Sequence, residues 1–268
     1  MSIDSFEAAM TLSVIAQKAG SEILGMKENI SSKQKSDGSP VTLADLRSNE
    51  IILDSLTDIW ANVPIVSEEG SMGDPRTSDH CFLVDPLDGT KEYLKENGMY
   101  TVNIALMKRQ ADMRWTPILG VVNAPESATT WVGGKQFNAI RQDEFGVDEI
   151  SVNKKLRPPV VLGSLSHSSA LDVSFAEDLG PHEFMPMGSS LKICRVADGF
   201  ADLSPRFGPT CCWDTAAAHA VLNSAGGNLY SPEGLELTYD VFDNLLNPWF
   251  LAASGDRWLD LWLNYQVH

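Results

Sequence analysis

The stretch HCFLVDPLDGTKEY, residues 80–93, decides the fold assignment, because an apolar run stops at two aspartates that bracket a proline and are followed by glycine and threonine. Residues 81–84 predict a buried strand, which places Asp85 at the carboxyl end where open α/β sheets hold their ligands. Asp88 follows three residues later. Pro86 stiffens the turn and Gly89 permits backbone angles that other residues resist, so both carboxylates can face one small volume.

Two carboxylates held so close predict a bound cation. Hard divalent ions such as Mg²⁺ take oxygen ligands, and the Leu87 carbonyl would add one between the two acids. Residues 90–97 predict a short helix whose unpaired amides would attract a phosphate. The alternative is a surface turn with a helix-capping aspartate, since Asp, Pro and Gly are ordinary turn residues.

Length and charge limit the possible partners. The 268 residues suffice for one large domain or for two closely joined halves. The formal net charge of −16 disfavours nucleic-acid polymers and anionic membranes, because the surface as a whole would repel both. A small phosphorylated molecule remains compatible, since its charge can be met locally by metal ions and a few basic groups.

Cysteine usage favours a reducing compartment. The four cysteines include no CxxC pair and no cluster at zinc spacing. The amino terminus lacks a basic start followed by an apolar segment, and no apolar run approaches the length that spans a bilayer. We therefore expect a cytoplasmic protein without a transmembrane segment; peripheral attachment to the cytoplasmic face of the inner membrane and the choice between monomer and homodimer stay open.

Hydrophobic periodicity predicts alternating helices and strands. The first half, residues 1–148, should contain two amphipathic helices separated by a polar excursion, a short strand ending at Ser67, and three antiparallel strands after the turn. The second half, residues 149–268, should alternate strand and helix and end in a core helix. The expected helices are 5–27, 42–60, 189–197, 214–225 and 256–265, and the later strands are 100–107, 118–124, 129–132, 160–165, 201–204 and 249–253.

Four acids sit at strand ends or helix starts and could converge on one crevice between the halves: Glu68, Asp85, Asp88 and Asp214. Three or four carboxylates can hold two metal ions a few Å apart, as two-metal phosphoryl chemistry requires. Simpler explanations remain for single residues. Asp214 is a natural helix N-cap, Glu68 can be a solvated loop acid, and Asp45 is a plausible capping-box partner for Thr42.

The ordered landmarks of the chain resemble the lithium-sensitive, magnesium-dependent phosphomonoesterases, which include inositol monophosphatase, fructose-1,6-bisphosphatase and the 3′(2′),5′-bisphosphate nucleotidases. The resemblance implies a mixed α/β (α+β) fold, a layered α/β/α/β/α sandwich. The segments TKEY, GSSLK and PRFGPT are similar to the bacterial bisphosphate nucleotidases. The landmarks are SDGSPVTLAD (36–45), SEEG (67–70), DPLDGTKEY (85–93), NGMYTVNIAL (97–106), GSSLK (188–192) and PRFGPTCCWDTAAAHAVLNSAGG (205–227).

The resemblance also implies roles for the acids. One Mg²⁺ would be held by Glu68, Asp85 and the Leu87 carbonyl, and a second by Asp85, Asp88 and Asp214, with a third, weaker ion left open. Gly89 and Thr90 would cradle the scissile phosphate. Asp45 matches the acid that partners this threonine, so Asp45 and Thr90, with Glu68, would orient or deprotonate the attacking water.

The remaining contacts would lie on the nucleotide side. The resemblance implies that Ser189 and Lys192 meet the second phosphate or the ribose and that His167 lies near the adenine, while Arg206 is a further candidate for charge neutralisation. An isolated histidine is more often only a satisfied polar group. Four residues depart from the usual nucleotidase pattern without removing a metal ligand, and they put substrate identity in doubt: Leu165, Cys211, Cys212 and Ala218.

Together these features predict a Mg²⁺-dependent hydrolase that converts 3′-phosphoadenosine 5′-phosphate to AMP and phosphate beside sulfate assimilation. An inositol monophosphatase would share every metal ligand and differ only in the pocket. From another class, the acids could form a non-catalytic cation-binding scaffold that regulates a partner. Such a scaffold has no need of Asp45 with Thr90 or of a glycine-bearing phosphate turn.

Overall fold

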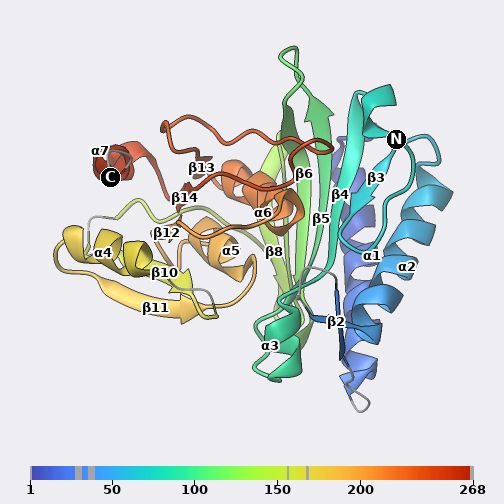
Figure 1. Cartoon of the computed structure of the whole chain (residues 1–268), viewed down its shortest axis with the longest axis horizontal. Coiled ribbons are helices and arrows are strands. Elements are labelled where there is room, and N and C mark those ends of the chain that lie inside the picture. The colour runs from blue at the N-terminus through green and yellow to red at the C-terminus, as the bar shows by residue number, and fades with distance from the viewer. Residues whose placement is uncertain (1, 28–31, 36–39, 156, 167–168, 266–268) are drawn as a thin grey trace.

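The structure, a computed structural model, describes residues 2–27, 32–35, 40–155, 157–166 and 169–265. Its elements form layers that follow one another across Figure 1: two long helices, a seven-stranded sheet, a central pair of helices, a five-stranded sheet, and an outer pair of helices. The predicted layered α/β/α/β/α sandwich is confirmed. The division into halves at residue 148 stays a prediction.

The layer of two long helices is formed by α1 (Phe6–Gly25) and α2 (Leu43–Ile59). Thr42 caps α2 in a capping box with Asp45, as the sequence predicted. A short hairpin of β1 (Ser32–Gln34) and β2 (Pro40–Thr42) precedes α2. The apolar faces of both long helices pack against the large sheet through a core that includes Ile23, Ile52 and Leu56.

The large sheet has the order β3-β4-β5-β6-β7-β8-β9 and is antiparallel except for the parallel pair β3 and β4. Two of its glycines face α6 (Cys212–Ser224), where a Cβ on Gly120 would lie 2.0 Å from the Ala217 carbonyl oxygen and one on Gly133 would lie 2.5 Å from the Val221 Cα. The helix therefore rests directly on the sheet. The strands are β3 (Ile65–Ser67), β4 (His80–Asp88), β5 (Thr101–Arg109), β6 (Trp115–Ala124), β7 (Thr129–Gly134), β8 (Phe137–Asp143) and β9 (Gly146–Glu149).

The small sheet has the order β11-β10-β12-β14-β13 and mixes parallel with antiparallel pairs. Between the sheets lie α5 (Leu191–Ala197) and α6, and the small sheet is covered on its other face by α4 (Ala170–Asp178) and α7 (Leu259–Asn264). Its strands are β10 (Val160–Ser164), β11 (Glu183–Met187), β12 (Leu203–Arg206), β13 (Asn228–Tyr230) and β14 (Phe250–Ala253).

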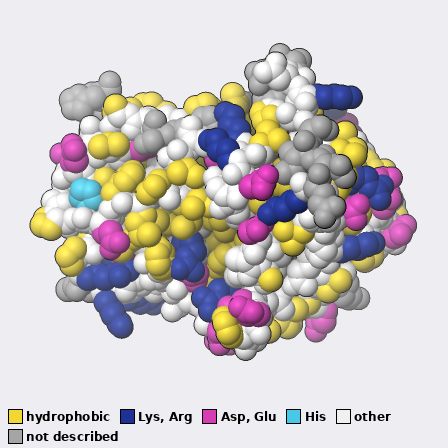
Figure 2. Space-filling view, turned by 90° about the horizontal axis from the view of Figure 1, so that it is seen from below, with side chains coloured by type: hydrophobic (Ala, Val, Ile, Leu, Met, Phe, Trp, Pro, Cys, Tyr) yellow, Lys and Arg dark blue, Asp and Glu magenta, His cyan; other side chains and the backbone are white. Residues whose placement is uncertain are grey.

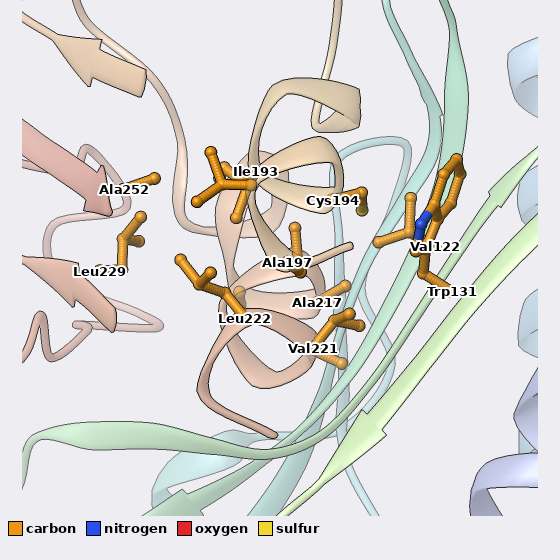
Figure 3. Packing of buried hydrophobic residues seen from close by; sticks show 14 of the residues in the cluster. Val122, Trp131, Ile193, Cys194, Ala197, Ala217, Val221, Leu222, Leu229 and Ala252 are labelled. Atoms are coloured by element: carbon orange, nitrogen blue, oxygen red, sulfur yellow. The ribbon is translucent and has the colours of Figure 1, made fainter. Parts of the chain in front are cut away.

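Figure 3 shows how the central helices join the two sheets. Val122 and Trp131 of the large sheet face Ala217 and Val221 of α6, while Ile193 of α5 and Leu222 of α6 lie toward Leu229 and Ala252 of the small sheet. These residues belong to one continuous buried cluster. Because α6 begins at Cys212, this core fixes the position of its N-terminal acid, Asp214.

Several sequence expectations need correction. The strand predicted to end at Val84 continues to Asp88 because β4 contains a bulge. Asp85 pairs with Asn103 and Asp88 pairs with Thr101, so β4 advances by three residues where β5 advances by two. The predicted turn is therefore a bulged strand. No predicted element corresponds to β1, β2, β8, β9, α4, β11 or β13, and the last predicted helix begins as a 3₁₀ turn, Asp256–Trp258.

Candidate active site

A cavity of about 290 Å³ lies where the end of β4, the start of α5, the end of β12 and the start of α6 meet. Its lining includes the five predicted metal ligands, Glu68, Asp85, Leu87, Asp88 and Asp214. It also includes the predicted substrate contacts Gly89, Thr90, Ser189, Lys192 and Arg206. The molecule seen from below shows acidic and basic side chains close together across the middle of that face (Figure 2).

The bulge in β4 presents two acids to the cavity with one oxygen of each already engaged. Asp85 Oδ1 accepts a hydrogen bond of 3.0 Å from the Leu87 N–H. Asp88 Oδ2 accepts one of 2.6 Å from the Ser190 N–H and a longer one of 3.4 Å from Asn103 Nδ2. The second oxygen of each carboxylate is thereby left to face a ligand.

Asp214, in the first turn of α6, is held in the same manner. Its Oδ2 accepts a hydrogen bond of 2.8 Å from the Cys211 N–H in a capping box. The N-cap of α6 is Cys211, so the interpretation of Asp214 as the N-cap is wrong by three residues. Asn247 donates to the Cys211 carbonyl at 2.8 Å and to Thr215 Oγ1 at 3.0 Å, which ties down the start of this helix.

The surroundings of these three acids disfavour their charged forms. Burial raises the pKa of Asp85 well above its ordinary value, and the charges of Glu68, Asp88 and Asp214 raise it further. Burial and then the charge of Asp88 raise the pKa of Asp214 well above its ordinary value. Burial raises the pKa of Asp88 to about 6, although Lys192 and hydrogen bonds oppose the shift. A divalent cation would remove this repulsion.

The donor set suits a hard ion, because it consists of carboxylate oxygens beside the Leu87 carbonyl. Within the part of the chain that the structure describes, no three His, Cys, Asp or Glu side chains lie close enough together to hold a metal ion by themselves. Carbonyl and water ligands would have to complete the coordination shell, and Mg²⁺ commonly keeps several waters. The residues present therefore fit the predicted ion.

Glu68 has a partner that the sequence analysis did not anticipate. Lys35 Nζ lies 2.6 Å from Glu68 Oε1 and 2.5 Å from Glu69 Oε1. Burial alone would lower the pKa of Lys35, but the hydrogen bonds to both glutamates raise it above its ordinary value. An ammonium thus lies against an acid for which the sequence predicts a metal ion, in a segment predicted only as a polar excursion.

Asp45 makes hydrogen bonds both to the capping residue Thr42 and to Thr90. Its Oδ2 accepts hydrogen bonds from the Thr42 N–H at 2.8 Å and from Thr42 Oγ1 at 2.5 Å, which completes the capping box. Its Oδ1 accepts one of 3.0 Å from Thr90 Oγ1 across the cavity wall. Burial raises the pKa of Asp45 against the effect of these hydrogen bonds. A helix-capping acid therefore also holds the threonine of the DGT turn.

Two basic side chains line the same cavity as the acids, half-buried Lys192 and buried Arg206. Lys192 Nζ donates to the Ser189 carbonyl at 2.6 Å, and burial lowers the pKa of Lys192 to about 8 despite the nearby Asp88. Arg206 is 8% exposed, donates from Nη2 to the Pro209 carbonyl at 3.1 Å, and has its pKa lowered by burial. His167, predicted near the adenine, lies outside the described residues.

Supporting polar residues were missed by the sequence analysis. Ser190 Oγ donates to Asn103 Oδ1 at 2.8 Å and lies 2.8 Å from Thr101 Oγ1, so a buried network stands behind Asp88. Asn103 within the apolar run TVNIAL is a signal that could have been recognised, because a buried amide needs hydrogen-bond partners. Glu92 also lines the cavity.

Comparison with known proteins defines the class. The model of the inositol monophosphatase family matches residues 5–255, so the chain belongs to this family. The predicted identification as a hydrolase of the superfamily is confirmed.

Curated relatives and solved structures agree with this class. Over 246 residues the chain is 41% identical to the 3′(2′),5′-bisphosphate nucleotidase CysQ of Escherichia coli, which covers 89% of this chain and 96% of the relative. A crystal structure of CysQ from Bacteroides thetaiotaomicron matches with a TM-score of 0.79 and 34% identity, over 93% of this chain and 98% of that one. An IMPase from Thermotoga maritima, at 20% identity, shares the fold with a TM-score of 0.81, over 98% of each chain. No helix in the described ranges is long and apolar enough to cross a membrane.

Proposed function

We propose that the protein is a Mg²⁺-dependent phosphatase that hydrolyses 3′-phosphoadenosine 5′-phosphate to AMP and phosphate. The observation that carries the proposal is that the acids Asp85, Asp88 and Asp214 and the basic side chains of half-buried Lys192 and buried Arg206 line one cavity. A substrate with two phosphates matches this combination, because one phosphate can meet metal ions and the other the basic side chains. The names of the similar CysQ proteins support the same substrate class.

In this proposal, Glu68, Asp85 and the Leu87 carbonyl would hold one ion and Asp85, Asp88 and Asp214 would hold a second, with a third, weaker ion left open. Bound divalent ions supply positive charge that offsets the acids and the phosphate, and they lower the pKa of a bound water.

The residues of the chain then position the reaction. Thr90 donates its hydrogen to Asp45, so its oxygen lone pairs can accept a hydrogen bond from the attacking water. As the water attacks phosphorus, its proton passes toward Thr90 and Asp45, and the raised pKa of Asp45 favours its acceptance. Glu68 helps to orient the water. The leaving 3′-oxygen takes a proton from solvent, which gives AMP and phosphate.

The substrate contacts follow from the same cavity. The scissile phosphate would lie against Gly89 and Thr90, in contact with the groups that surround the ions. Ser189 and Lys192 would bind the second phosphate or the ribose, and His167 would lie near the adenine.

We further propose that the protein works in the cytoplasm as a monomer or homodimer. None of its described cysteines forms a disulfide, which suits a reducing compartment.

The test compares phosphate release from adenosine 3′,5′-bisphosphate and from inositol 1-phosphate with Mg²⁺. We expect a clear preference for the nucleotide. Lys192→Met should reduce kcat/KM for the bisphosphate by about 10- to 100-fold, the loss typical of a charged hydrogen bond, and should change turnover of a nucleoside 3′-monophosphate less. Preference for the inositol ester would indicate an inositol monophosphatase. Mg²⁺ binding without phosphate release from any ester would indicate the non-catalytic scaffold.

A further inference from the structure

Glu92 is a buried acid in the active-site cavity to which the proposed mechanism gives no role. It lies in the short helix α3 (Thr90–Leu94), is 5% exposed, and lines the cavity beside the phosphate turn. A Cβ placed on Gly89 would lie 3.3 Å from Glu92 Oε2, so this oxygen is directed toward the turn.

The other oxygen of Glu92 is fixed from the opposite half of the molecule. Ser166 Oγ donates a hydrogen bond of 2.5 Å to Glu92 Oε1. Lys95 Nζ in turn donates to Ser166 Oγ at 3.3 Å. An ammonium can only donate, so the serine hydroxyl accepts from Lys95 and gives its own hydrogen to Glu92. The direction of this chain of hydrogen bonds is therefore defined.

The backbone behind Glu92 limits its movement. A Cβ on Gly188 would lie 2.9 Å from Glu92 Cγ and 2.6 Å from the Met99 carbonyl oxygen. The Glu92 side chain is thus enclosed by the segment around Gly188, just before α5, and its carboxylate is held by Ser166.

The second carboxylate oxygen, Glu92 Oε2, can only accept a hydrogen bond. Among the residues that the structure describes, none donates a hydrogen bond to Glu92 Oε2 and none forms an ion pair with Glu92 within 4.0 Å, although Lys192 lies near enough for the two charges to interact. A carboxylate here would repel a phosphate oxygen, whereas a hydroxyl group could donate to it. The chemistry of this position therefore selects an uncharged donor next to the scissile phosphate.

We propose that Glu92 Oε2 accepts a hydrogen bond from the sugar hydroxyl on the carbon next to the scissile phosphate, the 2′-hydroxyl of a ribonucleoside 3′-phosphate. The inference rests on the proposed function, because the phosphate at Gly89 and Thr90 sets where the ribose lies. It makes Glu92 a specificity-determining residue that separates ribose from deoxyribose substrates. The penalty for a missing hydroxyl arises because the buried carboxylate is left without a partner.

The experiment is a double-mutant cycle between the protein and the substrate. Wild type and Glu92→Gln are assayed for phosphate release from adenosine 3′,5′-bisphosphate and from its 2′-deoxy analogue. With Ser166 donating to the glutamine oxygen, the amide NH₂ group faces the sugar and the acceptor is lost. Glu96→Gln is the matched control, since Glu96 is an exposed acid just beyond the same helix.

Wild type and Glu96→Gln should lose about 10- to 100-fold in kcat/KM when the 2′-hydroxyl is absent. Glu92→Gln should lose a similar factor on the ribose substrate and little more on the deoxy substrate, so that the two losses are strongly non-additive. Ser166→Ala keeps the charge but releases Oε1, and it should weaken the discrimination between the two substrates.

Equal losses on both substrates for Glu92→Gln would overturn the inference, because Glu92 would then only tie the two loops together. An unchanged ribose-to-deoxyribose ratio with a shifted Mg²⁺ dependence would also overturn it and would make Glu92 a metal ligand. If wild type hydrolyses neither nucleotide but releases phosphate from another ester, the proposed function fails first and this inference falls with it.

Discussion

Replacing Asp88 by asparagine should make the metal-free protein more stable at neutral pH. The side chain is half-buried, and its pKa is raised from 3.8 to about 6, mainly by burial. Asparagine keeps the shape and can still accept the hydrogen bond that the Ser190 N–H donates to Asp88. The substitution therefore removes a poorly solvated charge, and with it one cause of the raised pKa of Asp214.

The size of the effect follows from proton linkage. A rise of about two pKa units corresponds to about 3 kcal/mol of destabilisation once the carboxyl is ionised in both states. For a chain of this length that amounts to a melting temperature higher by roughly 5–10 °C in Asp88→Asn. In saturating Mg²⁺ the difference in melting temperature between Asp88→Asn and wild type should shrink or reverse its sign. An ion that binds only the folded wild type adds about 3 kcal/mol to its stability at 100 times its Kd.

The sign of the pH dependence is fixed by the direction of the shift. An acid with a raised folded-state pKa binds its proton more tightly when folded, so wild type without metal should gain stability as pH falls through about 6. The difference from Asp88→Asn should vanish below about pH 4, where the carboxyl is protonated in both states.

Calorimetric melting of both proteins in a chelator, and then in Mg²⁺, across this pH range measures the effect. A metal-free Asp88→Asn that melts below wild type at neutral pH, with wild-type stability flat between about pH 5 and 8, would refute the reasoning.

Two further substitutions test the site and its support. Asp45→Asn should lower kcat by about 10²–10³-fold with little change in KM. The Thr42 N–H needs the remaining amide oxygen, so the NH₂ group faces Thr90 and Thr90 loses the acceptor of its hydroxyl hydrogen. Thr90→Ser should retain most activity, and steady-state kinetics that find Asp45→Asn fully active would contradict this. Gly120→Ala should cost about 1–3 kcal/mol or more because its Cβ would meet the Ala217 carbonyl, whereas Gly25→Ala, whose Cβ meets nothing within 4 Å, should be neutral in denaturant unfolding.

Local chemistry made part of this structure predictable. The capping box of Thr42 and Asp45 could be predicted from the spacing of these residues at the start of one helix. The buried strands β5 and β6 could be predicted from their apolar runs. By contrast β9 is fully exposed and β8 mostly polar, so neither carries the alternation that marks a strand, and α4 has weak amphipathicity. Such elements are held by pairing and tertiary contacts rather than by their own pattern.

The residues around the acids depend on distant parts of the chain. The contact of Ser190 with Asp88 joins residues 102 apart, and that of Ser166 with Glu92 joins residues 74 apart. Periodicity within a segment carries no information on such pairs. The continuation of β4 through Asp88 was missed for a related reason, because Pro86 and Gly89 suggest a turn whereas pairing with β5 keeps the bulged chain in the sheet.

The central claim is that acids from separate elements act together by holding divalent ions. It is tested most directly by measuring Mg²⁺ binding calorimetrically and phosphate release from adenosine 3′,5′-bisphosphate for wild type and Asp85→Asn. We predict that the variant folds, binds Mg²⁺ much more weakly and loses about a thousandfold or more in kcat, since the ions contribute several kcal/mol to the transition state. A folded Asp85→Asn that turns over at a near-normal rate would contradict the account.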